Sequence, residues 1–393
     1  MPDDDRSPSL DTRAVHEGAL SPRPFGAVST PVFQTANFEY HGEEYHDVGY
    51  LRLSNSPNHA VLHRRIASLE GSEDALVTGS GMAAISSALL TFLGAGDHLL
   101  VQDVVYGGTA NMLEHDLPRW GINHTKIDPQ DPASWEGAMT PSTRLVYVET
   151  LTNPLVQMAD LEAVVEFARA NGLISMIDNT FASPVLCRPA ELGFDLVMES
   201  CTKYMNGHND LVAGSVAGSA ERVRRIKLTL DHLGGSIDPH ACVLLERGLK
   251  TIGLRVRRQS ANALELARFL EGRPEIDEVH YPGLASHAQH DRASRLLDGG
   301  FGGMMAFVHG GGGEEADAFA SRLELPTVAA SLGGVESLII RPAAAIHSGL
   351  PPEARAEMGI NEGLMRFSTG VEAAEDLIAD FAQALGTPVS RPA

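Results

Sequence analysis

The sequence predicts an α/β protein, in which a mainly parallel central sheet with helices on both faces is followed by a smaller α+β domain. From about residue 60, short apolar runs alternate with amphipathic helical stretches, which is typical of parallel strands connected by helices. The runs that we expect to form strands are ALVT near 75, LLVQD at 99–103, LVYVE at 145–149, LISMID at 173–178 and FDLVMES at 194–200.

One helix is bracketed by two of these strands. In DLEAVVEFARANG, Asp160 is placed to be the N-cap, the apolar positions recur at helical spacing, and Asn171-Gly172 supplies a left-handed stop. A longer helical pattern from about 241 to 272 is expected to lead into the second region.

The second region contains further strand candidates, EVHYPG, GGMMAFVHG and ESLIIRP, and a closing helix, AEDLIADFAQALG. The glycine run at 310–313 is interpreted as a loop tip. The N-terminal segment lacks a regular apolar pattern and is rich in Pro, Gly, Ser, Tyr and His. We therefore predict three parts: an arm at 1–55 that contacts a neighbouring subunit, a large domain at 56–250 and a small domain at 251–393.

Charge and composition exclude several classes of function. The 393 residues include 30 Lys and Arg against 51 Asp and Glu, a net charge of −21, so binding to nucleic acid or an anionic membrane is not expected. No apolar run of about 18 residues occurs and the first residues are acidic, so we expect a soluble, cytoplasmic protein. The three cysteines, Cys187, Cys201 and Cys242, form no CxxC pair and the histidines are scattered, so neither a disulfide nor a metal site is expected.

Chemically useful residues follow several of the predicted strands. Ligands bind outside the carboxyl ends of strands in open α/β sheets. The run ALVT leads through Gly79-Ser80-Gly81-Met82 into a helix whose free N–H groups suit a phosphate. Asp178 ends another run, and Lys203 closely follows a third. Each alone has an ordinary structural explanation, such as a cap or a surface ion pair, but together they match the phosphate, pyridine nitrogen and aldehyde of pyridoxal phosphate.

The segment SCTKYMNGH at 200–208 resembles the lysine motif of the cystathionine γ-lyase and γ-synthase family, the pyridoxal-phosphate enzymes of cysteine and methionine metabolism. Other motifs of that family occur in its order from about 12 to 387. They are Tyr50-Leu51-Arg52, Ser80 to Ala84, Tyr106 to Thr109, Glu149 with Asn153-Pro154, Asp178 to Phe181, Ser331 to Gly334, and Arg366 in GLMRFSTGVE.

The resemblance implies a type I aminotransferase fold and a dimer with shared active sites, commonly paired again as a homotetramer. It implies catalytic roles for Lys203, which would form a Schiff base with the cofactor, for Asp178 at the pyridinium nitrogen, and for Tyr106 stacked on the ring. The implied phosphate ligands are the N–H groups of Gly81 and Met82, the hydroxyls of Ser200 and Thr202, and Tyr50 and Arg52 from the neighbouring subunit. The implied substrate-carboxylate ligands are Arg366, Ser331 and Asn153.

The chemistry requires an unusual lysine. Once displaced by the substrate amine, Lys203 is the natural base for the α-proton, but an ordinary lysine is protonated at neutral pH. We therefore expect burial and neighbouring positive charge to lower its pKa. Tyr106 either assists proton transfer or only stacks on the ring, and the sequence leaves both roles open.

The motifs do not select one reaction, because the same residues support β-elimination, γ-elimination and γ-replacement. The leading hypothesis is a carbon-sulfur lyase acting on cystathionine or a related sulfur amino acid by γ- or β-elimination, giving a 2-oxo acid, ammonia and a thiol. The alternative is a γ-synthase-like transferase that performs γ-replacement on an O-acyl-homoserine. Intact Lys203, Asp178 and Arg366 argue against a non-catalytic relative.

Two departures from the family's patterns bear on the substrate. Ala330 replaces a glutamate that cystathionine enzymes often carry before Ser-Leu-Gly-Gly, and Gly108 replaces a cysteine typical of methionine γ-lyases. These two residues therefore support neither a dedicated methionine γ-lyase nor recognition of the distal ammonium of cystathionine. The extra residue in Asn55-Ser56-Pro57-Asn58 and Arg341 before Pro342 have no explanation from sequence.

Overall fold

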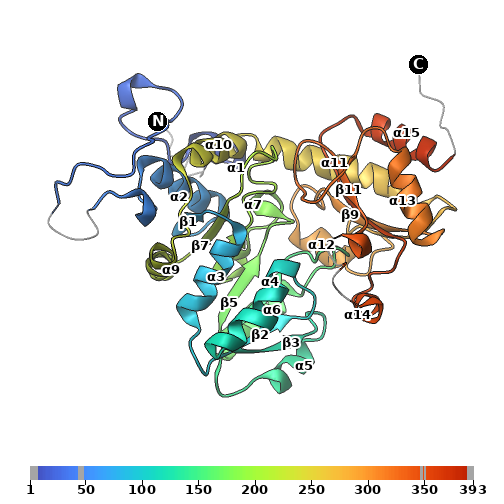
Figure 1. The fold of residues 1–393 in the computed structure, drawn as a ribbon, viewed down its shortest axis with the longest axis horizontal. Helices are drawn as coiled ribbons and strands as arrows, with labels where there is room; N and C mark the ends of the chain where they lie inside the picture. Colours follow the sequence, from blue (N-terminus) through green and yellow to red (C-terminus); the bar gives the residue numbers. More distant parts are fainter. Residues whose placement is uncertain (1–7, 43–47, 346–347, 349–350, 387–393) are drawn as a thin grey trace, which may run out of the picture.

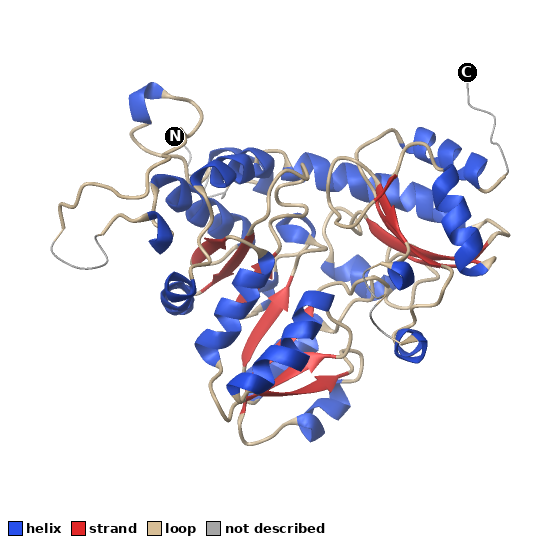
Figure 2. Cartoon of the chain, viewed as in Figure 1, coloured by secondary structure: helices blue, strands red, loops and turns tan. Residues whose placement is uncertain are grey.

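The computed structural model describes residues 8–42, 48–345, 348 and 351–386. Within them, one sheet of seven strands has the order β1-β7-β6-β5-β4-β2-β3 (Figures 1 and 2). Strand β7 is antiparallel to both its neighbours, and the remaining pairs are parallel. The strands are β1 (Asp74–Thr78), β2 (His98–Gln102), β3 (Asn123–Ile127), β4 (Thr143–Glu149), β5 (Ile174–Asp178), β6 (Leu196–Glu199) and β7 (Gly214–Gly218). The predicted mainly parallel sheet is confirmed, and all five predicted strands are present.

Two strands of this sheet were not predicted. Strand β3 lies at the sheet edge and has the polar sequence NHTKI, so it shows no apolar alternation. Strand β7 has the sequence GSVAG, and its small residues are required by close packing, because a Cβ on Gly214 would overlap the carbonyl of Ser80.

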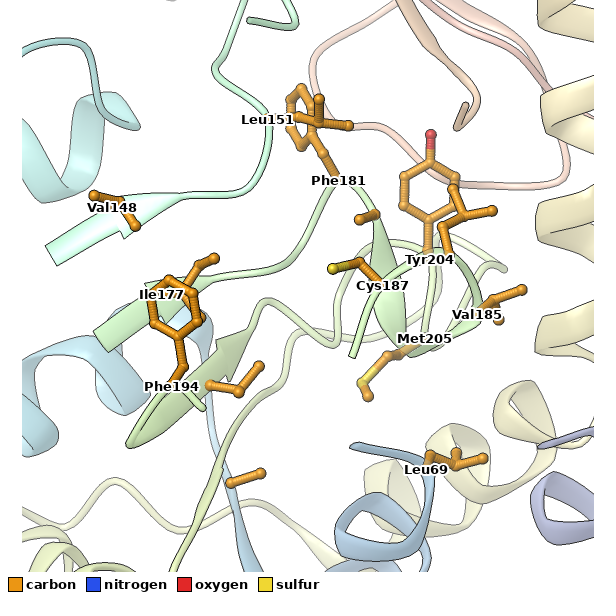
Figure 3. Close-up of a cluster of buried hydrophobic side chains, with 14 of the residues drawn as sticks. Leu69, Val148, Leu151, Ile177, Phe181, Val185, Cys187, Phe194, Tyr204 and Met205 are labelled. Atoms are coloured by element: carbon orange, nitrogen blue, oxygen red, sulfur yellow. The ribbon is translucent and has the colours of Figure 1, made fainter. Parts of the chain in front are cut away.

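Helices cover both faces of the sheet. They are α1 (Leu10–His16), α2 (Pro57–Glu70), α3 (Gly81–Phe92), α4 (Gly107–Asn111), α5 (Pro132–Trp135), α6 (Leu161–Ala170), α7 (Ser183–Leu186), α8 (Pro189–Leu192) and α9 (Ala220–Leu233). Successive strand residues point to opposite faces, so Tyr147 and Met176 belong to one core and Val148 and Ile177 to the other. Figure 3 shows part of the core that contains Val148 and Ile177, to which Phe194 also belongs.

Helix α6 forms as predicted. The Asp160 carboxylate accepts a hydrogen bond from the Ala163 N–H at 3.2 Å, and Gly172 adopts φ 64° after the last turn. The predicted arm differs partly from expectation, because α1 packs against α2 and buries Ala14 in the core. Beyond α1, the arm exposes apolar side chains, Phe25 and Val28 among them.

The long helical pattern at 241–272 forms two helices, not one. Helix α10 (Pro239–Leu249) ends before α11 (Ile252–Glu271) begins. The carbonyl of Gly248 accepts hydrogen bonds from Thr251 Oγ1 and Arg255 Nη2, which replace the continuing helical ladder. Domain limits near 55 and 250 remain a prediction.

A second sheet has the order β10-β11-β12-β9-β8, with only β10 and β11 parallel. Its strands are β8 (Ile276–His280), β9 (Met304–His309), β10 (Thr327–Val328), β11 (Leu338–Ile340) and β12 (Leu364–Ser368), and its helices are α12 (His290–Leu296), α13 (Gly312–Arg322), α14 (Pro352–Glu357) and α15 (Ala374–Ala384). The smaller α+β region is therefore confirmed. Only part of the glycine run at 310–313 is a turn, because Gly312 and Gly313 begin α13.

Two kinds of structural feature are absent from the described residues. No helix there is both long and apolar enough to cross a bilayer. No cluster of three or more His, Cys, Asp or Glu side chains there has the geometry to hold a metal ion.

Candidate active site

A cavity of about 680 Å³ opens at the carboxyl ends of β4, β5 and β6. Ser331 and Arg366, from the region of the second sheet, line it together with Asp178 and Lys203. The strand-end residues singled out by sequence therefore meet in one space, as expected for an open α/β sheet.

The N-terminus of α3 forms one end of this cavity. The Ser80 hydroxyl caps the helix by accepting the Ala83 N–H at 3.0 Å, while Gly81 and Met82 line the cavity. Because the first N–H groups of a helix have no partner within it, this end can bind an anion. A Cβ on Gly81 would lie 3.1 Å from the Ser200 Cβ, so the residue at this position must be small.

The hydroxyls of Ser200 and Thr202 also line the cavity. The Thr202 hydroxyl donates to the carbonyl of Ala213 at 3.1 Å and accepts its N–H at 3.0 Å, which fixes the turn that follows β6. Thr180 joins this turn to β5, because its hydroxyl accepts the Ser200 N–H at 2.8 Å.

Asp178 ends β5 with its carboxylate in the cavity. Burial raises its pKa to about 6, while hydrogen bonding from Thr180 opposes the rise. The Thr180 N–H donates to Asp178 Oδ1 at 2.9 Å. A protonated nitrogen beside this carboxylate would favour its charged form.

Glu149 lies opposite Asp178 on the neighbouring strand β4. Burial, followed by the charge of Asp178, raises the pKa of Glu149 well above its ordinary value. Its Oε1 accepts the backbone N–H of Tyr106 at 2.6 Å, and this holds the first turn of α4. The sequence marked Glu149 as a strand end and as part of a motif but gave it no role in the site.

Lys203 follows β6 and is largely buried. Burial, and then the charge of Arg366, lowers the pKa of Lys203 from 10.5 to about 8. Both causes are those expected from the chemistry. Lys203 Nζ donates to the Ser331 hydroxyl at 2.8 Å.

Arg366 lies on β12, between β9 and β11. Its neighbours Met365 and Phe367 point into the core of the second sheet, so its own side chain points the other way, into the cavity. Nη1 donates to Asn153 Oδ1 at 3.2 Å and Nη2 donates to the Ser331 carbonyl at 2.9 Å. Burial lowers its pKa to about 10. A buried arginine held by neutral oxygens is suited to an incoming carboxylate.

Tyr50 and Arg52 do not line this chain's cavity. The Arg52 guanidinium lies 5.6 Å from the centre of the Tyr50 ring and donates to the Asp231 carbonyl at 2.6 Å. Both side chains are exposed.

Three sequence features to which we assign no catalytic role lie outside the cavity lining. Arg341 forms a two-point ion pair with Asp317 at 2.9 and 2.8 Å and a bond to Glu362 at 2.9 Å. Asn55, in the segment with the extra residue, accepts the Tyr50 N–H at 2.9 Å. The Cys201 thiol points towards Met205 Sδ, and Cys201 does not line the cavity.

A family model described as "Cys/Met metabolism PLP-dependent enzyme" matches residues 11–386. The chain belongs to this family. It is therefore a pyridoxal-phosphate-dependent enzyme, as the motifs predicted.

Proteins named for different reactions are similar to this chain. L-methionine gamma-lyase from Pseudomonas putida is 43% identical over 389 residues, covering 96% of this chain and 97% of that protein. Cystathionine gamma-lyase from Bacillus subtilis (strain 168) is 39% identical over 376 residues, covering 95% and 98%. The crystal structure of cystathionine gamma synthase from Xanthomonas oryzae pv. oryzae has a TM-score of 0.92 and 37% identity, covering 97% and 98%. The predicted fold of this family is confirmed.

The cavity residues fit pyridoxal phosphate. The end of α3 offers N–H donors for the phosphate, Asp178 offers a carboxylate for the ring nitrogen, and Lys203 offers an amine of lowered pKa for the aldehyde. When bound, the cofactor supplies an electron sink for bonds to the substrate's α-carbon.

Proposed function

We propose that this enzyme is a carbon-sulfur lyase that acts on small sulfur amino acids and releases a thiol, ammonia and a 2-oxo acid. The observation that carries the proposal is the contact between Lys203 Nζ and the Ser331 hydroxyl, beside Arg366. It puts a base of lowered pKa next to a buried guanidinium that can hold the substrate carboxylate, so the α-proton would face the base.

The other cavity residues receive roles within the same proposal. Asp178 holds the proton of the ring nitrogen, and Tyr106 lies at the ring and at the cavity mouth. The phosphate is bound by the residues Gly81, Met82, Ser200 and Thr202, and the substrate carboxylate by Arg366, Asn153 and Ser331. The cavity lining, which includes both the N-terminus of α3 and Arg366, and the neutral oxygens that hold the Arg366 guanidinium support this division.

The cavity wall favours an uncharged thioether over cystathionine. Val212, Ala330 and Leu332 line the wall without a charge, and the carboxylates among the described lining residues, Glu149 and Asp178, lie together on adjacent strands. Ala330 and its neighbours in the described cavity lining, Ser331 and Leu332, therefore offer no carboxylate to the distal ammonium of cystathionine. A Cβ at position 108 would lie 2.5 Å from the Tyr106 ring and 3.0 Å from Met82 Sδ. The Tyr106 and Met82 side chains therefore occupy the space beside Gly108, where methionine γ-lyases typically have a cysteine.

The test is product analysis of the cofactor-loaded enzyme. L-Methionine, L-cystathionine, and an O-acyl-homoserine with cysteine are supplied separately, and oxo acid, thiol and thioether products are measured. We expect methionine alone to give a thiol and 2-oxobutanoate, with less turnover of cystathionine. Product only from the ester and cysteine together would favour the transferase, for which the similarity to a γ-synthase is the supporting observation.

A matched variant tests the basis of this preference. Ala330→Glu places a carboxylate at the apolar wall, so we expect cystathionine turnover to rise relative to that of methionine. An unchanged ratio would mean that Ala330 does not set the preference.

We also propose a cytoplasmic homo-oligomer with shared active sites, a dimer that pairs into a tetramer. The exposed apolar side chains of the arm and the exposed pair Tyr50 and Arg52 support a neighbouring subunit at this surface. In this arrangement, Tyr50 and Arg52 bind the phosphate in the neighbour's cavity.

A further inference from the structure

Helix α11 carries three buried polar side chains on one face. Arg255, Gln259 and Asn262 are spaced at i, i+4 and i+7, so they lie on the same side of the helix. Each is at most 6% exposed, and each donates to main-chain carbonyls outside α11. Figure 1 shows α11 running from α10 to the second sheet, alongside both regions that form the cavity. Because buried donors are costly when unpaired, these side chains hold particular backbone segments in place.

Arg255 holds the turn that carries Lys203. Its Nη1 donates to the Tyr204 carbonyl at 2.8 Å and its Nη2 to the Met205 carbonyl at 3.3 Å. Nη2 is also bonded to the Gly248 carbonyl at 2.9 Å, which anchors the guanidinium to the end of α10. Burial lowers the pKa of Arg255 to about 10, and no acidic group among the described residues opposes this effect. The planar fork of arginine is suited to binding several carbonyls at once.

Gln259 holds the loop that carries Ser331. It is fully buried, and its Nε2 donates to the Gly334 carbonyl at 2.6 Å. This loop lies directly on the lysine turn, because a Cβ on Gly333 would be 2.7 Å from the Tyr204 nitrogen. The loop and the lysine turn are also joined by a hydrogen bond of 3.0 Å from the Val335 N–H to the Gly207 carbonyl.

We infer that Arg255 and Gln259 are positioning residues, which set the distance between Lys203 and Ser331 by fixing the two segments to one rigid helix. The inference rests on the proposed role of Lys203. One turn of α11 separates the two side chains, and the segments they hold meet at the bond of 2.8 Å from Lys203 Nζ to the Ser331 hydroxyl. A misplacement of about 1 Å can cost about 100-fold in rate, so a fixed spacing at this point matters for the reaction.

The test compares two substitutions on the same face of α11. Gln259→Met removes the donor to Gly334 at similar volume. Asn262→Leu is the matched control, because it removes an equally buried donor whose carbonyl partners, Gly370 and Glu372, lie outside both segments. For each variant we would measure thermal unfolding of the apoenzyme, kcat and KM, and the pH dependence of covalent cofactor binding by Lys203, followed by its visible absorbance.

We expect both variants to lose similar thermal stability. Gln259→Met alone should lower kcat by about tenfold or more and move the pH midpoint of cofactor binding. Asn262→Leu should keep kcat within about twofold and leave the midpoint in place. Equal losses of kcat in the two variants, or an unchanged kcat and midpoint in Gln259→Met, would overturn the inference.

A second variant decides the matter if Gln259→Met does not fold. Arg255→Lys keeps the charge but replaces the planar fork of donors by a single compact ammonium, which does not match the positions of the three carbonyls, so it should lower kcat and move the same midpoint. Wild-type values for both in this variant would overturn the inference. If the wild-type enzyme bound the cofactor but had no lyase activity, the proposed function would fail, while the midpoint would still test the positioning role.

Discussion

The backbone N–H of Tyr106 donates to Glu149 Oε1 at 2.6 Å. This bond joins the end of a central strand to the loop that carries an aromatic ring at the cavity mouth. Because Glu149 is also the strand partner of Asp178, one buried carboxyl group is adjacent to two residues proposed to contact the cofactor ring.

Replacing Glu149 should therefore disturb Tyr106. We expect Glu149→Leu to lower kcat by about tenfold, because the N–H of Tyr106 loses its acceptor and the loop can shift. Glu149→Gln is the control, since its amide oxygen can still accept the bond, and it should stay within about threefold of wild type. Steady-state kinetics of the two variants make the comparison, and equal effects would show that the hydrogen bond is not what matters.

The pKa of Lys203 predicts a pH dependence for the apoenzyme. Only the neutral amine can attack the cofactor aldehyde, and burial together with Arg366 lowers its pKa to about 8. The rate of covalent cofactor binding should thus rise with pH and level off above about 8. Removing the positive charge with Arg366→Leu should move this midpoint upward, whereas Arg366→Lys should move it less. Stopped-flow absorbance measures the rates, and an unshifted midpoint in Arg366→Leu would contradict the electrostatic explanation.

Glu70 predicts a pH dependence of stability. It is fully buried at the end of α2, and burial raises its pKa from 4.5 to about 8. Between these values the folded protein holds a proton that the unfolded chain releases, so the free energy of unfolding falls as pH rises through this window. In Glu70→Gln this contribution is absent, and the variant should gain thermal stability relative to wild type as pH increases from 5 to about 8. A difference in melting temperature that does not change with pH would refute the prediction.

Arg52 tests the shared active site. We expect Arg52→Ala to lose the cofactor more readily on dialysis, although this side chain lies outside its own chain's cavity. A mixture of Arg52→Ala and Lys203→Ala subunits supplies the control, because hybrid dimers should contain one site with neither substitution. Recovery of activity on mixing is the expected result, and none would be seen if each chain built its site alone.

The strand ends and the lysine motif were readable from sequence because each depends on local pattern. Asp178 ends one apolar run and Lys203 closely follows another, and Asp160 caps α6 as its sequence indicates. The role of Glu149 was not readable, because its partner is a backbone N–H from a distant loop. Strand β7 was missed for a related reason. It contains small residues because Gly214 lies close to the backbone of Ser80, a contact between distant segments that the local sequence pattern does not reveal.

The break between α10 and α11, inside the helical pattern at 241–272, could not be predicted from local sequence either. The apolar spacing of this pattern continues through Lys250 and Thr251, and the break depends on side chains that take up the Gly248 carbonyl. The contacts of Arg255 and Gln259 with two distant segments likewise emerge only from the tertiary structure.

The most direct test of the account is the absorbance spectrum and turnover of Lys203→Ala beside the wild type, each incubated with pyridoxal phosphate and then with L-methionine and L-cystathionine. The account predicts that wild type acquires a visible band from the lysine-bound cofactor, and that the band changes on adding substrate while oxo acid and thiol accumulate. The variant should show neither the band before substrate nor product above background. Full turnover by Lys203→Ala, or a wild type that never binds the cofactor covalently, would contradict it.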